Sequence, residues 1–118
     1  MPVTTKLDAT RQRRRLESLL ARLERRTEKV ERDLRREAAP FDRDAEERAI
    51  EMENEEVLLG LEREGQDQIG LVRSALARLD AGTYERCADC RGSIPAARLQ
   101  ALPYATTCVR CAEARERS

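Results

Sequence analysis

The chain has 118 residues, of which 39% are charged and only 3% are aromatic, so it buries little apolar surface and is expected to need a staple such as a metal site. The net charge is zero, but residues 1–39 carry 12 basic and 7 acidic side chains, whereas residues 40–67 carry 3 basic and 11 acidic ones. DNA phosphates would repel this acidic block, and no segment approaches the roughly 20 apolar residues of a membrane span or the apolar core of a signal peptide, so we expect a cytoplasmic protein.

The first predicted element is a long amphipathic helix. Its stripe positions recur in steps of 4, 3, 4, 3 and 4 residues, and only a helix presents this 3.5-residue period as one face. The stripe consists of Leu16, Leu20, Leu23, Thr27, Val30 and Leu34. Pro40 ends the run, because proline cannot continue a helix and pushes Ala39 out of the helical region.

A second helix is predicted from after Asp44 to about Ala81, where Gly82 provides a C-cap signal. Its stripe is expected to slip near Gly65 and to contain Ile50, Val57, Leu61, Ile69, Val72, Leu76 and Leu79. Two such helices with a short connection should fold back on each other. The sequence therefore predicts an antiparallel coiled-coil hairpin over residues 1–82 with its tip at about 39–49, although pairing of each helix with a second chain is an alternative.

Four cysteines form two C-x-x-C pairs, Cys87 with Cys90 and Cys108 with Cys111, separated by 17 residues. This spacing indicates one tetrahedral zinc site, and four protein ligands leave no position for a reactive water, so the Zn²⁺ should be structural. Gly92 fits the sharp turn that offers backbone amides to sulfur. Disulfides or redox dithiols are the alternative reading. The expected fold class is mainly α, with a four-cysteine zinc finger over residues 83–118 that ends in a short helix.

The segment around the cysteines also resembles a known family. The specific stretch between the two pairs reads Ile94-Pro-x-x-Arg-Leu-x-Ala-x-Pro103, after Gly82-Thr-Tyr-Glu-Arg-Cys and before Cys108-Val-Arg-Cys111. It closely resembles the zinc finger of the DksA/TraR family, and the likeness extends over about residues 40–115. The first helix is similar in character more than in sequence.

The resemblance implies a regulator that binds bacterial RNA polymerase beside its secondary channel, and not an enzyme. The hairpin would enter the channel, and its acidic tip would alter the stability of promoter complexes. The family tip reads Asp-x-x-Asp-x-Ala, which Asp44, Glu47 and Ala49 match here, with Glu47 in place of the second Asp; Asp42 is a competing carboxylate. Direct sequence-specific DNA binding is not expected.

The tip residues also have a plain structural interpretation, because Asp44 and Glu47 are spaced like a helix capping box. Where relatives that respond to ppGpp carry basic residues, this chain has Glu64, Leu71 and Ala112. A phosphate-rich ligand needs cationic contacts, so ppGpp dependence is expected to be weak or absent.

Two other functions remain open on the sequence alone. One is a zinc-finger coiled-coil adaptor associated with proteins or DNA, whose DNA binding would depend steeply on salt. The other is a transcript-cleavage factor of the Gre kind, which is also an acidic-tipped hairpin but lacks this zinc finger. Transcript cleavage on stalled polymerase would distinguish it.

Overall fold

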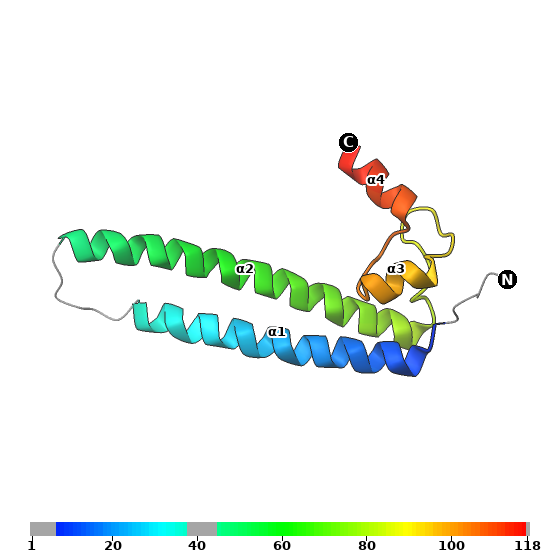
Figure 1. Cartoon of the computed structure of the whole chain (residues 1–118), viewed down its shortest axis with the longest axis horizontal. Helices are drawn as coiled ribbons and strands as arrows, with labels where there is room; N and C mark the ends of the chain where they lie inside the picture. The colour runs from blue at the N-terminus through cyan, green and yellow to red at the C-terminus, as the bar shows by residue number, and fades with distance from the viewer. Residues whose placement is uncertain (1–6, 38–44, 118) are drawn as a thin grey trace. The chain divides into compact units, whose positions relative to one another are not determined.

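The computed structural model describes the backbone of residues 7–37 and 45–117 and the side chains of residues 7–36 and 52–117. Over these residues the chain is helical and contains no strand, which confirms the mainly α class. The helices are α1 (Ala9–Glu37), α2 (Ala45–Ala81), α3 (Ala96–Ala101) and α4 (Val109–Arg117), as Figure 1 shows. None of the described helices is both long enough and apolar enough to cross a membrane.

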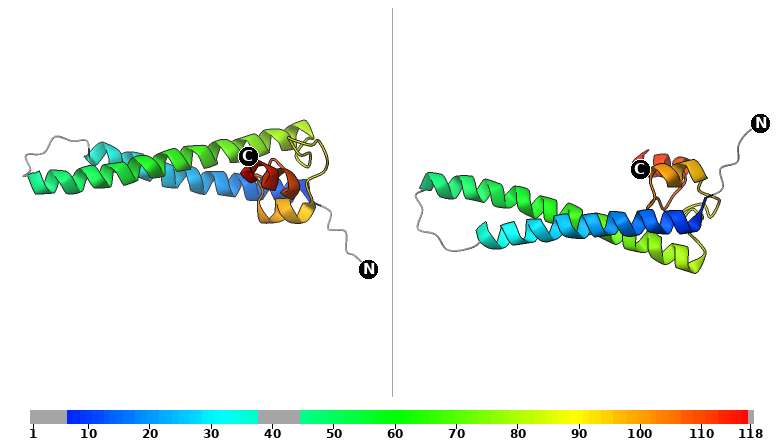
Figure 2. Two further views of the ribbon diagram at one scale, coloured as in Figure 1. Left: turned by 90° about the horizontal axis from the view of Figure 1, so that it is seen from above. Right: turned by 60° about the horizontal axis from the view of Figure 1, so that its bottom comes forward.

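The chain forms two compact units, and both long helices pass through both of them. We call Met1–Leu20 with Leu71–Ser118 the finger unit and Ala21–Gly70 the helical unit. Within each unit α1 and α2 lie side by side and run in opposite directions, in every view of Figures 1 and 2. The antiparallel pairing within the chain is therefore as predicted, while a domain boundary at residue 82 stays a prediction.

Helix α1 begins where a carboxylate caps it. The backbone amides of Thr10 and Arg11 donate to Oδ1 of Asp8 at 3.0 and 3.2 Å, which satisfies two of the amides that a helix start leaves unpaired. The predicted stripe faces inward, and its buried members are Leu16, Leu23, Thr27 and Val30. The 3.5-residue period therefore placed the first helix and its inner face correctly.

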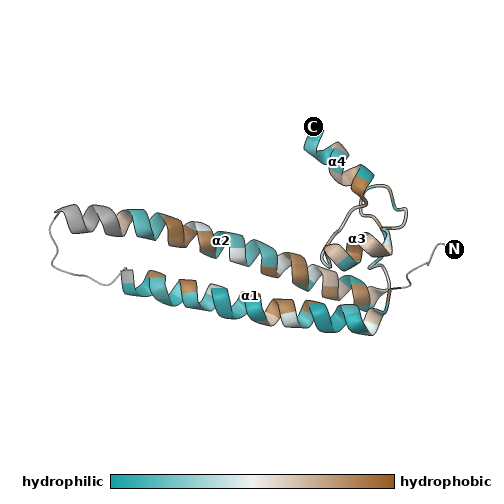
Figure 3. Ribbon diagram, in the orientation of Figure 1, coloured by the Kyte–Doolittle hydropathy of each residue, from teal (hydrophilic) through white to brown (hydrophobic). Residues whose placement is uncertain are grey.

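The inner face of α2 is as predicted at Ile69, Val72, Leu76 and Leu79 but differs before Gly65. Val57 and Leu61 are 62% and 47% exposed, and the side chain of Ile50 lies outside the described residues. The face turned inward follows steps of 4, 3, 4, 3, 4 and 3 without a slip: Leu58, Glu62, Gly65, Ile69, Val72, Leu76 and Leu79. The predicted slip near Gly65, with Val57 and Leu61 facing inward, was wrong because Glu62 and Gly65 occupy inner positions without being apolar. Figure 3 shows that hydrophobic residues recur along much of α2, so hydropathy alone does not identify its inner face.

Gly65 lies at an inner position because Thr27 of α1 packs directly against it. A Cβ atom on Gly65 would lie 2.3 Å from Oγ1 of Thr27, which is far inside van der Waals contact. A Cβ on Gly60 or Gly70 would meet no described atom within 4 Å. Only Gly65, among these three glycines of α2, is therefore required by the close approach of the two helices.

Helix α2 ends at the predicted C-cap. Gly82 adopts a φ of +76°, which glycine tolerates without strain. The amide of Thr83 donates to the carbonyl of Arg78 at 3.0 Å, and that of Gly82 donates to the carbonyl of Leu79 at 3.3 Å. This paired pattern is a Schellman motif, and it turns the chain out of α2 toward the first cysteine pair.

Candidate metal centre

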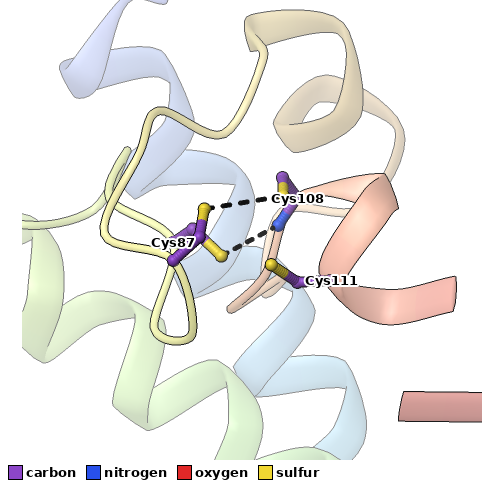
Figure 4. A group of neighbouring side chains, drawn as sticks. Cys87, Cys108 and Cys111 are labelled. Atoms are coloured by element: carbon purple, nitrogen blue, oxygen red, sulfur yellow. Dashed lines mark hydrogen bonds between the residues drawn. The ribbon is translucent and has the colours of Figure 1, made fainter. Parts of the chain in front are cut away.

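The four cysteines predicted as zinc ligands come together in the finger unit. Cys87 and Cys90 follow the end of α2, Cys108 directly precedes α4, and Cys111 lies in the first turn of α4. All four sulfur atoms lie within 4.8 Å of one another. Figure 4 shows the sulfurs of Cys87, Cys108 and Cys111 turned toward a common point.

The spacing of the sulfurs fits one tetrahedral zinc ion. A Zn–S bond of about 2.3 Å places tetrahedral sulfurs about 3.8 Å apart, and the sulfurs of Cys90 and Cys108 are 3.9 Å apart. A disulfide would require about 2.05 Å, and all four cysteines are free thiols. The disulfide alternative is therefore wrong, and the donor set is that of a structural Zn²⁺ site.

Backbone amides support the sulfurs as expected for a zinc knuckle. The amide of Gly92 donates to Sγ of Cys90 at 3.4 Å, and the amide of Cys108 donates to Sγ of Cys87 at 3.4 Å. A Cβ on Gly92 would lie 3.3 Å from Sγ of Cys90. The predicted role of Gly92 is confirmed: it lets the turn approach the sulfur that its own amide binds.

The residue before that glycine is strained. Arg91 has a φ of +63°, and it is the one described non-glycine residue with a positive φ. Its amide donates to the carbonyl of Cys87 at 3.0 Å, so the turn itself imposes this conformation. Arginine in this region costs about 1 kcal/mol more than glycine would, and the zinc site gives no reason for that choice.

The pKa values of Cys87 and Cys111 shift in opposite directions because the two thiols have different hydrogen-bond partners. The amides of Cys90 and Cys108 lower the pKa of Cys87 to about 6, since they donate to its thiolate. Hydrogen bonds that the Cys111 thiol donates, first to Cys108 and then to Cys87, raise the pKa of Cys111 to about 12. The cluster therefore keeps protons at neutral pH that a bound Zn²⁺ must displace, which makes metal binding pH-dependent.

A buried polar network fastens the zinc finger to the first turns of α1. Nε2 of Gln12, which is 2% exposed, donates to Oη of Tyr84 and to the carbonyl of Leu99, both at 3.0 Å. Oη of Tyr84 donates to the carbonyl of Pro103 at 2.6 Å, and Arg15 donates to Oε1 of Gln12 at 2.8 Å. Sequence reasoning missed Gln12, although it lies one step of four before Leu16.

A second connection joins the first cysteine turn to α4. The guanidinium of Arg115 donates to the carboxylate of Asp89 through Nε and Nη2, and Nε lies 2.6 Å from Oδ2. The Arg115 side chain lowers the pKa of Asp89 through this hydrogen bond. The pair orients α4 relative to the cysteine turn, and its exposure keeps its contribution to stability small.

The predicted tip residues are not among those brought together at the metal centre. Asp44 lies outside the described residues, and so does Asp42. Glu47 and Ala49 lie in the first turns of α2, but their side chains are not described. The role of Asp44, Glu47 and Ala49 stays a prediction.

The fold and the site together define a two-helix protein closed by a C4 zinc finger. Residues 82–117 match the prokaryotic dksA/traR C4-type zinc finger, and residues 12–79 match the DnaK suppressor protein-like N-terminal domain. The chain belongs to the DksA/TraR family, and Zn²⁺ is its structural cofactor.

Solved structures agree with this assignment. Transcription factor DksA2 from Pseudomonas aeruginosa is 28% identical, with a TM-score of 0.83 over 92% of this chain and 83% of that one. The DnaK suppressor protein from Agrobacterium tumefaciens is 34% identical, with a TM-score of 0.63 over 97% of this chain and 99% of that one. None of the curated proteins matches the chain.

Proposed function

We propose that this protein is a cytoplasmic transcription regulator that binds bacterial RNA polymerase at the secondary channel and is not an enzyme. The observation that carries the proposal is the consecutive match of both family segments, residues 12–79 and 82–117, on a chain with the paired helices and cysteine cluster described above. A relative that shares this fold is described as a transcription factor. Zinc would fix the finger, and the helices would present the acting residues.

The acting residues in this proposal are Asp44, Glu47 and Ala49. They lie within the block of residues 40–67, which carries 11 acidic and 3 basic side chains. Carboxylates at the end of paired helices can approach basic side chains or Mg²⁺ ions, for which oxygen ligands are suited. Ala49 adds no bulk beside them. The same carboxylates can cap α2, and the two roles are compatible.

Apolar side chains on α2 support a partner for the helical unit. Four large ones are substantially exposed: Met52, Val57, Leu59 and Leu61. Several exposed apolar side chains on one stretch of helix are typical of an interaction surface. A polymerase-binding protein would cover part of this surface in its complex.

The test compares neutral variants of the tip acids with a matched acid elsewhere on α2. Asp44→Asn keeps a capping side chain, so we expect an unchanged fold, normal binding to polymerase in a pull-down, and loss of the effect on promoter-complex lifetime. Glu47→Gln should act in the same direction. Asp67→Asn, an exposed acid on the same helix, should have no effect. Full activity of Asp44→Asn would remove the tip from the mechanism.

A deletion tests docking and action separately. A protein that lacks residues 40–49 should still bind polymerase, because the remaining helices and the finger provide the docking surface, but should no longer alter promoter complexes. If the intact zinc-loaded protein does not bind RNA polymerase, the proposed partner is wrong. Cleavage of backtracked transcripts by the intact protein would instead favour a Gre-like role.

Dependence on ppGpp is proposed to be weak. Glu64 and Leu71 are exposed, and Ala112 is half-buried, so none of these positions offers a cation to a phosphate. Promoter-complex lifetimes measured with the protein, with and without ppGpp, should agree. A large additional effect of ppGpp that requires the protein would contradict this expectation.

A further inference from the structure

The part of α2 that precedes Gly65 carries two apolar side chains on its exposed side. Val57 and Leu61 are 62% and 47% exposed. Each directly precedes a residue of the inner face, since Leu58 follows Val57 and Glu62 follows Leu61. Leu58 and Glu62 are themselves only half-buried. A displacement of this segment by one residue would therefore replace a carboxylate with an apolar side chain on the inner face.

The facing surface of α1 is better suited to the displaced segment. Thr27 and Gly65 pack against each other. In an antiparallel pair, Val30, three residues after Thr27, then lies opposite Glu62, three residues before Gly65. Val30 is only 9% exposed, and a carboxylate gains little beside a buried apolar side chain. Leu61 in the place of Glu62 would bury more apolar surface against the same residue.

Gly65 marks the point at which such a displacement has to end. Beyond it, Ile69 is 4% exposed and already faces inward within the helical unit. One extra residue between Leu61 and Ile69 makes a single wider turn, a π-bulge, which α-helices accommodate without ending. Glycine lowers the cost of this turn because its backbone is the least restricted. The second register therefore needs a change in one turn of α2 only.

The hydroxyl group of Thr27 is an independent observation at the same turn. Its Oγ1 is buried and has no hydrogen-bond partner among the described residues. It lies directly against the backbone of α2, since a Cβ on Gly65 would be 2.3 Å from it. A π-bulge leaves a helix carbonyl without its regular amide donor, and a side chain inserted there can replace that donor. Thr27 is placed to donate to this carbonyl.

A partner surface also explains why Val57 and Leu61 are exposed, and the two explanations are compatible. A partner does not explain why Glu62 occupies an inner position. It also does not explain why the hydroxyl of Thr27 is buried without an acceptor among the described residues. A second register accounts for all three features, because it turns Glu62 outward, buries the apolar pair and provides the acceptor.

We propose that the segment of α2 before Gly65 exchanges between the observed register and a second one in which Val57 and Leu61 face α1. The displacement of one residue turns the segment by about 100° and shifts it by about 1.5 Å. A partner that covers Val57 and Leu61 binds only the observed register and so shifts the populations toward it. This partner would also fix the rotation of the first turns of α2, where Glu47 lies. Only that consequence rests on the proposed function, since the exchange is a property of the free chain.

The test measures relaxation dispersion of valine and leucine methyl groups by NMR on the zinc-loaded full chain, which reports exchange on the microsecond to millisecond timescale. We expect the second register to be populated to at least about 1%. The methyl groups of Val57, Leu61 and Val30 should then share one exchange rate. Those of Leu71, which is 42% exposed on the same helix beyond Gly65, should show no such exchange. Absence of dispersion at Val57 and Leu61 would overturn the proposal.

Two variants should move the equilibrium in opposite directions without impairing folding. Glu62→Leu makes the observed inner face apolar, so the population of the second register should fall by roughly tenfold or more. Leu58→Gln weakens the observed inner face alone, so that population should rise by a similar factor. A change in the same direction in both variants would contradict the exchange of registers.

Matched variants separate a change of register from local unfolding. Leu61→Gln removes the apolar side chain that the second register buries, so the dispersion at Val57 should disappear. Leu71→Gln, the matched control, should leave it unchanged. Thr27→Val removes the hydroxyl and should also lower the population of the second register. If the dispersion persists in Leu61→Gln, or if Leu71→Gln abolishes it equally, the motion is local unfolding of α2 and the proposal is wrong.

Discussion

Replacement of Gly65 by alanine tests the packing of α1 against α2 most sharply. In an exposed helix interior, glycine to alanine gains about 1 kcal/mol. At Gly65 the new Cβ would lie 2.3 Å from Oγ1 of Thr27, and Thr27 has few alternative rotamers in a helix. Overpacking of this kind costs about 1–3 kcal/mol. We therefore expect Gly65→Ala to be neutral to about 2 kcal/mol destabilising, as the balance of these two effects.

The matched controls lie on the same helix. Gly60→Ala and Gly70→Ala place a Cβ where no described atom lies within 4 Å, so each should stabilise the protein by up to about 1 kcal/mol. The free energy of unfolding is measured by denaturant titration of the zinc-loaded protein, with circular dichroism at a helical wavelength. The reasoning about the contact is refuted if Gly65→Ala stabilises the protein as much as Gly70→Ala does.

A double-mutant cycle with Thr27 identifies the cause. Oγ1 of Thr27 is buried without a hydrogen-bond partner among the described residues, so Thr27→Ala removes an unsatisfied hydroxyl together with a buried methyl group. These two effects oppose each other, and the single variant should be close to neutral. In the double variant Thr27→Ala with Gly65→Ala the clash is absent, so the stabilisation that alanine gives a helix relative to glycine should reappear. We expect a favourable coupling of at least about 1 kcal/mol, and an additive cycle would contradict the contact.

Three further predictions concern the finger unit. Gln12→Ala should lower the free energy of unfolding by about 1–3 kcal/mol, because it leaves buried partners unsatisfied; an exposed Gln100→Ala control should not, and denaturant titration measures both. Removal of zinc by a chelator should cause loss of amide protection around Leu99 in hydrogen exchange, and retained protection would show that the metal is dispensable. Burial raises the pKa of Tyr84 above 10.0, so its contribution to stability is complete below pH 10.0 and is lost as the pH rises through the raised value; phenolate absorbance of a Tyr104→Phe variant measures this titration directly.

Local patterns were sufficient for much of this fold. The stripe of α1 is regular because every inner position from Leu16 to Leu34 except Thr27 is apolar, so period alone located the helix and its face. The cysteine spacing was equally informative, since tetrahedral thiolate ligation restricts which pairs of turns can share one ion. Gly82 marked the end of α2 because a left-handed cap favours glycine.

The inner face of α2 could not be predicted in the same way. A periodicity argument counts apolar residues, but Glu62 and Gly65 occupy inner positions without being apolar, and at Gly65 the reason lies in α1. The glycine is explained only by Thr27, which is 38 positions earlier in the chain. The spacing of Val57 and Leu61, which are exposed, therefore suggested an apolar stripe on the wrong face of α2. Such a contact depends on the facing surface of α1, so the sequence of α2 alone does not predict it.

The contacts of Gln12 and Arg78 were missed for a related reason. Gln12 donates to Tyr84, which is 72 residues away, and Arg78 becomes conspicuous only because two of its nitrogens are buried without a hydrogen-bond partner in the part of the chain that the structure describes. On the sequence each is an ordinary polar residue of a charged helix. Their significance depends on burial, which the zinc finger creates by covering the ends of α1 and α2 within its unit.

Because the zinc finger creates this burial, we expect the metal to stabilise more of the molecule than the two cysteine turns. Leu99 and Pro103 lie in the segment between the two cysteine pairs, and their carbonyls accept the hydrogen bonds of Gln12 and Tyr84. Zinc holds both ends of that segment, so metal binding orders the acceptors that hold the first turns of α1. Because a buried amide without acceptors is strongly unfavourable, loss of zinc should loosen α1 near Gln12 although no cysteine lies in that helix.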